Sequence, residues 1–167
     1  RYVAFWNGVH VYVRGILRNQ QSLFGEIQLN GMVMNAAPQP LTLTFRSTSY
    51  PDEVRTAEVG PTGWFWVTGL EPRLYTLHVK GAKWLAQNIT VDLSSGDVGT
   101  VNLTLPGGDA DNNNIVDVED LSVLVASFDA APGDSNWLSG ADFNCDEIVD
   151  VNDLALFIEN FDMIGDA

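Results

Sequence analysis

Two short segments place oxygen-bearing side chains at alternate positions, a pattern that can coordinate a metal ion. The first segment contains Asp109, Asp111, Asn113, Asp117 and Asp120, and the second contains Asp142, Asn144, Asp146, Asp150 and Asp153. In a 12-residue loop these side chains occupy positions 1, 3, 5, 9 and 12, and position 7 is apolar, as Ile115 or Ile148. A hard cation such as Ca²⁺ takes about six to eight oxygens, and a tightly coiled loop brings alternate side chains and the position-7 carbonyl inward. The sequence therefore predicts two calcium ions, with the apolar side chain at position 7 anchoring each loop in the core.

Position 6 of such a loop normally needs a positive φ angle, which favours glycine. Here it is occupied by Asn114 in the first loop and by Glu147 in the second. Asparagine tolerates this conformation better than glutamate does. We therefore expect the second loop to be the more strained of the two.

The two loops are copies of one repeat. A shift of 33 residues aligns 109–129 with 142–162, with nine identities in 21 positions. Apolar residues at helical spacing follow each loop: Leu121, Leu124, Val125 and Phe128, then Leu154, Phe157, Ile158 and Phe161. The pattern predicts a loop followed by a helix, twice, which a disordered acidic tail would not show.

Charge divides the chain into two parts. Residues 1–105 carry eight basic and seven acidic residues, whereas residues 106–167 carry fifteen acidic residues and no Lys or Arg. Such a negative segment excludes nucleic acid as a partner and favours divalent cations. We place the domain boundary at Pro106, where two glycines follow and the periodicity changes.

Before this boundary, short runs of alternating apolar and polar residues are separated by turn sequences, which is typical of strands. About seven strands at such spacing predict an antiparallel, Ig-like β-sandwich, so the fold class is mainly β with a small α part. We expect an aromatic core built from Phe45, Trp64, Trp66, Tyr75 and Trp84. A sugar-binding role for Trp64 and Trp66 is therefore disfavoured.

Residues 1–23 are apolar and aromatic near their start, and two interpretations remain open for them. They form the first edge strand of the sandwich, or they are donated to the sheet edge of a neighbouring copy. Arg1 stands where a methionine would begin a full translation product, so we expect a processed product or a fragment, consistent with export. No apolar run is long enough for a membrane span.

We expect no catalytic activity. His10 and His78 lack a nucleophile or second histidine at suitable spacing, and carboxylates bound to calcium cannot shuttle protons. The single cysteine, Cys145, excludes an internal disulfide, and its loop position suggests that it points outward. Asn88 and Asn102 begin glycosylation sequons and are candidate glycan acceptors.

Two family resemblances follow from these motifs. The doubled loop from Gly108 to Met163, with Asp at position 12 and no helix before the first loop, resembles the dockerin repeats. The run from Gly63 to Val79 resembles the prealbumin-like or carboxypeptidase-regulatory-like sandwiches over residues 24–105, although Arg73 replaces their usual glycine.

The dockerin resemblance implies a cohesin-like partner that contacts exposed helix residues. The corresponding positions are Val118, Glu119, Val125 and Ala126 in the first repeat, and Val151, Asn152, Ile158 and Glu159 in the second. The paired Ser/Thr and basic residues of the best-known dockerins are missing, and Val118 and Val151 could instead pack against the chain's own sandwich. The expected function is thus a secreted, bacterial cell-surface assembly protein, which either binds further copies of itself in a fibre or is the dockerin tail of a larger product.

Overall fold

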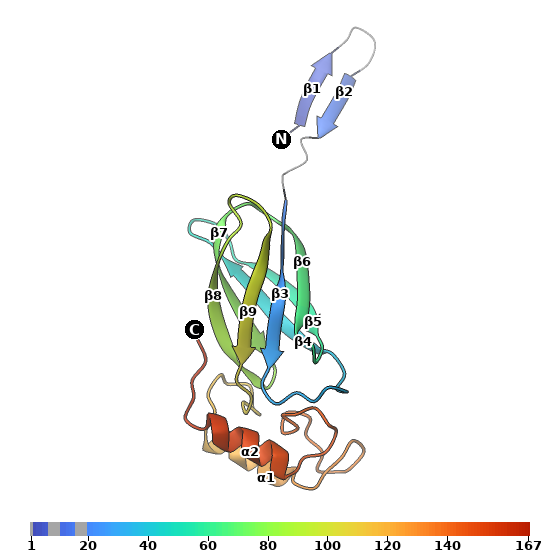
Figure 1. Cartoon of the computed structure of the whole chain (residues 1–167), viewed down its shortest axis with the longest axis vertical. Helices are drawn as coiled ribbons and strands as arrows, with labels where there is room; N and C mark the ends of the chain where they lie inside the picture. The colour runs from blue at the N-terminus through green and yellow to red at the C-terminus, as the bar shows by residue number, and fades with distance from the viewer. Residues whose placement is uncertain (1, 7–10, 16–19) are drawn as a thin grey trace.

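A computed structural model of the chain describes residues 2–6, 11–15 and 20–167. Seven strands form the central body: β3 (Gln21–Leu29), β4 (Gln39–Arg46), β5 (Glu53–Val59), β6 (Trp64–Leu70), β7 (Leu74–Gly81), β8 (Trp84–Asp92) and β9 (Val98–Leu105). Two short helices, α1 (Val118–Ala126) and α2 (Val151–Asn160), lie side by side at one end of this body (Figure 1). Among the described residues, no helix is long and apolar enough to cross a membrane.

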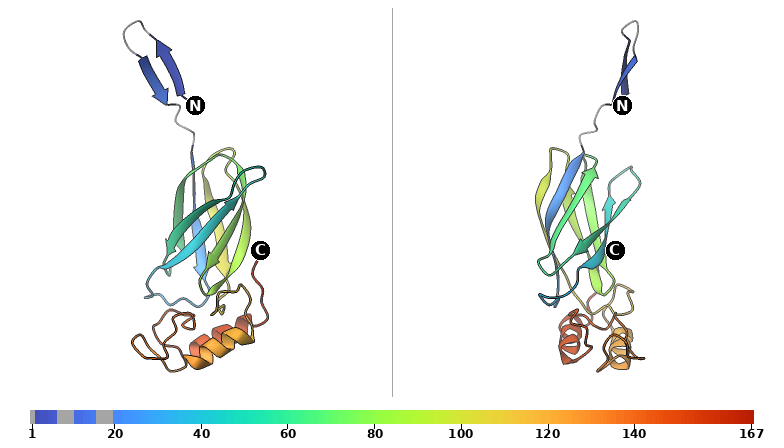
Figure 2. Two further views of the ribbon diagram at one scale, coloured as in Figure 1. Left: turned by 180° about the vertical axis from the view of Figure 1, so that it is seen from behind. Right: turned by 90° about the vertical axis from the view of Figure 1, so that its right-hand side faces the viewer.

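The strands form two layers, one ordered β6-β3-β9 and the other β5-β4-β7-β8, which lie on opposite sides of the body (Figure 2). All neighbours are antiparallel except β3 and β9, which run parallel. The prediction of a purely antiparallel sandwich is therefore wrong at this pair. After β8 the chain crosses to the other sheet, where β9 lies beside β3 and runs in the same direction. The alternation of apolar and polar residues within a strand cannot predict which distant strand it pairs with.

The core fills the space between the sheets. Phe45, Tyr75 and Trp84 are buried in it, as predicted, and the Phe45 and Tyr75 rings meet edge to face with centroids 5.7 Å apart. In contrast, Trp64 and Trp66 are 59% and 72% exposed, so their predicted place in the core is wrong. A strand alternates its side chains between two faces, and β6 turns Phe65 and Val67, the residues next to the tryptophans, inward instead.

The N-terminal region contains two further strands. β1 (Tyr2–Trp6) and β2 (Val11–Gly15) pair with each other in an antiparallel two-stranded sheet. Residues 21–23 belong to β3, the middle strand of the three-stranded sheet. Residues 1, 7–10 and 16–19, including His10, lie outside the described residues, so donation of this segment to another copy stays a prediction.

The helical part and the sandwich each contribute a buried residue to the apolar cluster of the other. Leu85 of β8 is buried in the apolar cluster of the helical part, together with Val116, Leu124 and Phe157. Conversely, Cys145 of the second loop is buried in the sandwich cluster, so the expectation that it points outward is wrong. Its burial follows from the loop lying against the sandwich, and this burial raises the pKa of its thiol. The two parts therefore share one continuous packed interface.

Hydrogen bonds cross the same interface. The Val33 N–H donates to the carbonyl of Asn144 at 2.9 Å, which joins the β3–β4 connection to the second loop. The side-chain amide of Asn160, at the end of α2, donates to the carbonyl of Gly107 at 2.8 Å in a buried contact. These bonds fix the position of the helices relative to the sandwich.

Candidate metal centre

Both acidic segments fold into the same tightly coiled backbone. Positions 4 and 6 adopt positive φ angles in each loop: 64° and 72° at Asn112 and Asn114, and 61° and 69° at Cys145 and Glu147. The positive φ expected at position 6 is therefore present in both loops. For an L-residue this conformation costs roughly 1–2 kcal/mol, and asparagine is better suited to it than glutamate.

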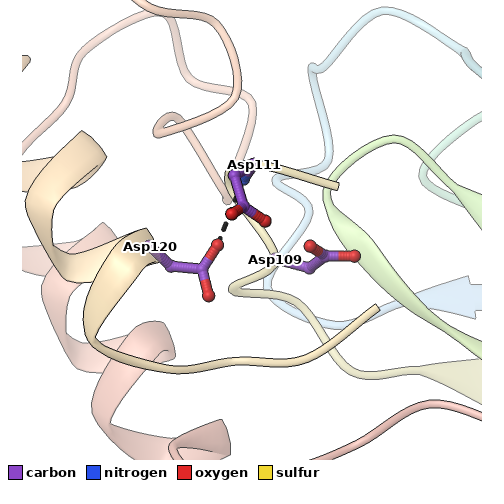
Figure 3. A group of neighbouring side chains, drawn as sticks. All are labelled: Asp109, Asp111 and Asp120. Carbon is purple, nitrogen blue, oxygen red and sulfur yellow. Dashed lines mark hydrogen bonds between the residues drawn. The ribbon is translucent and has the colours of Figure 1, made fainter. Parts of the chain in front are cut away.

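In the first loop, three carboxylates converge on one point. Asp109, Asp111 and Asp120 each offer an oxygen, and these oxygens lie within 4.8 Å of one another (Figure 3). Asp109 is fully buried; its Oδ2 accepts the Asn114 N–H at 3.1 Å, while its Oδ1 is buried without a hydrogen-bond partner. A buried carboxylate oxygen without a partner is costly unless a cation satisfies it. An all-oxygen donor set with such an orphan fits a hard cation such as Ca²⁺.

Asp120, at position 12, connects the loop to α1. Its carboxylate accepts the backbone N–H groups of Asp111 at 3.1 Å and of Asp117 at 2.8 Å. Asp117 in turn caps the helix by accepting the Glu119 N–H at 2.8 Å. The residues at positions 9 and 12 therefore begin the helix as well as facing the loop.

The second loop repeats this framework. Asp153 accepts the N–H groups of Asn144 at 3.1 Å and of Asp150 at 2.9 Å, and Asp150 caps α2. Asp142 accepts the N–H groups of Asp146 and Glu147 at 3.2 and 3.3 Å. Over the described part of the chain, three carboxylates gather closely only in the first loop; the second has an amide at position 3.

The remaining predicted ligands also occupy their loop positions. In the first loop the side chain of Asn113 accepts the Ile115 N–H at 2.8 Å, and in the second Asp146 accepts the Ile148 N–H at 3.0 Å. Ile148 is exposed, so the predicted anchoring of the loop by the position-7 side chain is wrong there. The buried anchors are the next residues, Val116 and Val149.

These two valines also join the repeats to each other. Val116 exchanges backbone hydrogen bonds of 2.9 Å with the chain that follows α2, at Asp162 and Met163. Val149 makes the equivalent bonds, at 2.9 and 3.0 Å, with Asp129 and Ala130 after α1. Each loop therefore pairs with the end of the other repeat, and the two loops form one unit.

Burial changes the acid–base properties of the ligand carboxylates. Removal from water raises the pKa values of Asp120, Asp142 and Asp153 above the usual range for aspartate. The exposed Glu119 also has a raised pKa, because of its hydrogen bond to Asp117 and the charge of that residue. The ionised forms are thus disfavoured until a cation neutralises them.

The sandwich contributes two lysines that sequence analysis did not connect with the loops. The ammonium of Lys80 donates to Asp109 Oδ2 and to Asn112 Oδ1, both at 2.7 Å, and to the carbonyl of Trp84 at 2.9 Å. Lys83 donates to the carbonyl oxygens of Ser139 and Asp142. They are the only lysines of the chain, at 80 and 83, but spacing gives no hint of their distant partners.

Lys80 and a cation can use different oxygens of the same carboxylate. Lys80 contacts Oδ2 of Asp109, whereas the oxygen without a partner is Oδ1. The ion pair therefore leaves Oδ1 available to a cation.

The predicted partner residues lie on the outer surfaces of the helices. Val118, Val125, Val151 and Ile158 are each between 61% and 65% exposed, and the neighbouring Glu119, Ala126, Asn152 and Glu159 are exposed as well. The alternative that Val118 and Val151 pack against the sandwich is therefore wrong. Four exposed apolar side chains, two on each helix, form what we call the helix patch.

The fold of this chain is similar to that of solved structures with low sequence identity to it. No family profile and no curated sequence relative matches it. A chain of a type II cohesin–X-dockerin complex from Acetivibrio cellulolyticus, a C-terminal interface mutant, has a TM-score of 0.69 and 17% identity over 87% of this chain and 97% of that chain. An N-terminal interface mutant of that complex gives the same values. A DUF3823 family protein from Parabacteroides merdae matches with a TM-score of 0.40 and 20% identity over 53% of this chain and 47% of that chain.

Proposed function

We propose that this chain is a non-catalytic, extracellular calcium-binding module that joins proteins through the helix patch. The observation that carries the proposal is the equivalent placement of exposed apolar residues on two helices whose first turns are built by calcium-loop residues. Exposed apolar clusters on a folded surface mark interaction sites.

Two calcium ions would be held by the side chains of Asp109, Asp111, Asn113, Asp117 and Asp120, with the Ile115 carbonyl, and by those of Asp142, Asn144, Asp146, Asp150 and Asp153, with the Ile148 carbonyl. Bound calcium supplies the positive charge that this acidic segment lacks. Asp120 and Asp153 then remain ionised and continue to cap their helices, which holds the helix patch in place. Calcium binding and presentation of the patch are thereby coupled.

The partner we propose is a cohesin-like domain. The fold neighbour comes from a cohesin–X-dockerin complex, and its match spans more of this chain than residues 1–105 could supply. This extent supports a counterpart in that neighbour for the loop–helix part as well as for the sandwich. This supports a dockerin-like role for the helical part and a location at the bacterial cell surface.

Association with further copies of the chain is the second candidate. The apolar N-terminal segment and the helix patch would each supply a contact, which would produce a fibre. A self-associating chain differs from a docking chain in its mass without any partner, so one experiment separates the two candidates.

The test measures mass and binding with calcium and with a chelator. Size-exclusion chromatography with light scattering gives the mass of the chain alone, and biolayer interferometry measures its binding to an immobilised type II cohesin domain. Docking predicts a monomer that binds cohesin only in calcium; a calcium-dependent polymer supports self-association. A monomer that never binds cohesin contradicts the docking role.

Variants in the helix patch test whether it is the surface that binds cohesin. The double variant Val118→Asp/Val151→Asp should abolish cohesin binding, because it places charge in both halves of the helix patch. Met34→Asp is the matched control, since Met34 is also an exposed apolar residue but lies outside the helices. Equal loss of binding in the control would contradict the assignment of the patch.

A further inference from the structure

A second surface lies on the outer face of the β6-β3-β9 sheet, which faces the viewer in Figure 1 above the helices. Trp64 and Trp66 project from β6, and Phe24 projects from β3 directly opposite Trp66. These three exposed rings form what we call the aromatic face. Trp64, Trp66 and Phe24 also line an open hollow of about 400 Å³ at the side nearest β5.

The geometry of the strands sets the positions of these rings. Residues two apart on one side of a strand are separated by roughly 7 Å, so the two indoles stand in a row. The Phe24 ring lies over Gly99 of β9, where an added Cβ atom would overlap the ring. The lack of a side chain at Gly99 therefore lets the Phe24 ring lie over β9, on the far side of β3 from Trp66.

Polar side chains are interleaved with these rings. Glu26 lies opposite Trp64 on one side and opposite Asn102 on the other, and Gln28 follows on the same strand face. In the described structure, the side chains of Glu26, Gln28 and Asn102 have no hydrogen bond to protein. Each can therefore bond to a ligand that lies on the rings.

Charge limits the class of ligand. The aromatic face and the hollow carry two carboxylates, Glu26 and Glu58, and no Lys or Arg among their described residues. A phosphate, sulfate or acidic polysaccharide would be repelled. A neutral saccharide is complementary, because its C–H face packs on aromatic rings while its hydroxyl groups bond to carboxylates and amides.

We infer that the aromatic face binds a neutral, extended polysaccharide. A row of rings along one face of a sheet suits a chain of sugar units better than a single compact sugar. The face lies on a side of the sandwich, whereas the helix patch lies at its end (Figure 1). A polysaccharide and a protein partner can thus be bound at the same time.

The test uses the full chain in calcium and polyacrylamide gels containing cellulose derivatives, xylan or mixed-linkage β-glucan, with polygalacturonate as the anionic control. We expect at least one neutral β-linked polysaccharide to retard migration and to shift the tryptophan fluorescence to shorter wavelength. Trp64→Ala and Trp66→Ala should each weaken binding at least tenfold, and Trp66→Phe should weaken it less. Tyr50→Ala removes an exposed ring elsewhere and should leave binding unchanged.

Three outcomes would overturn the inference. The first is the absence of retardation by every neutral polysaccharide. The second is equal retardation of the wild type and of both tryptophan variants. The third is a dimer that Trp66→Ala dissociates, which would show that a second copy covers the aromatic face. Circular dichroism confirms that each variant is folded.

Discussion

Replacement of Lys80 by methionine should weaken the attachment of the first acidic loop to the sandwich. The change keeps the length of the side chain and removes the ammonium that contacts Asp109 at 2.7 Å. Asp109 is fully buried, whereas the Lys80 side chain is 19% exposed. Removing one partner of a buried ion pair costs about 3–5 kcal/mol, and the partial exposure of Lys80 places this pair near 3 kcal/mol. For a chain of this size, such a loss lowers Tm by roughly 6–12 °C.

Bound calcium should reduce the loss of stability that Lys80→Met causes. A bound ion supplies the positive charge that the Asp109 carboxylate otherwise takes from Lys80. Only the hydrogen bonds from Lys80 to Asn112 and to two backbone carbonyls are then lost, so the substitution should cost less in calcium than in chelator. Thermal unfolding followed by circular dichroism, in calcium and in chelator, measures both values.

Arg73→Met is the matched control, because it makes the same change in net charge at a half-exposed site against Tyr50, away from the loops. It should shift Tm little in either condition. The reasoning is refuted if Lys80→Met lowers Tm by the same amount with and without calcium, or by no more than Arg73→Met does.

Three further predictions concern the loops. Asp109→Asn should reduce the calcium stoichiometry measured by isothermal titration calorimetry from two to one, and an unchanged value of two would contradict the assignment of the first site. Glu147→Gly should raise the free energy of unfolding in calcium by about 0.5–1 kcal/mol by relieving the positive φ. In the same denaturant titration Asn114→Gly should lower it, because the Asn114 side chain accepts the Ala86 N–H at 2.8 Å and donates to the Asp166 carbonyl at 3.1 Å. Without calcium, the free energy of unfolding should rise on acidification, because the folded state raises the pKa values of three carboxyl groups, those of Asp120, Asp142 and Asp153. The stability that these groups contribute is fully present below the pKa of aspartate in the unfolded chain. It is lost as the pH rises through their pKa values in the folded state. Chemical denaturation from pH 3 to 8 in chelator measures this slope, and a stability that increases with pH over this range would contradict it.

The coiled loops could be predicted because the residues that form each of them are close in sequence. Alternate oxygen side chains, the turn at position 6 and the following helix all lie within about twenty residues, and a repeat displays each feature twice. The structure places Asp109 and Asp142 at the start of equivalent coils, as their spacing indicates.

Features that depend on distant parts of the chain could not be predicted in this way. Alternation along β6 is equally compatible with either face inward, and the size of Trp64 and Trp66 favoured the wrong choice over Phe65 and Val67. Similarly, the burial of Cys145 and the contact of Lys80 with Asp109 arise from an interface between segments that are far apart in sequence. Neither the burial of Cys145 nor the contact of Lys80 with Asp109 can be predicted from the residues next to it in the sequence.

The parallel pair of β3 and β9 has a mechanical consequence. The chain enters the sandwich at the start of β3, far from the helices, and leaves it at the end of β9, next to them. Tension applied between the N-terminal side and a partner held on the helices pulls these two neighbouring strands in opposite directions along their length. Their hydrogen bonds are then loaded together in shear instead of being opened one after another, so the sandwich resists extension along the line between its two attachment points.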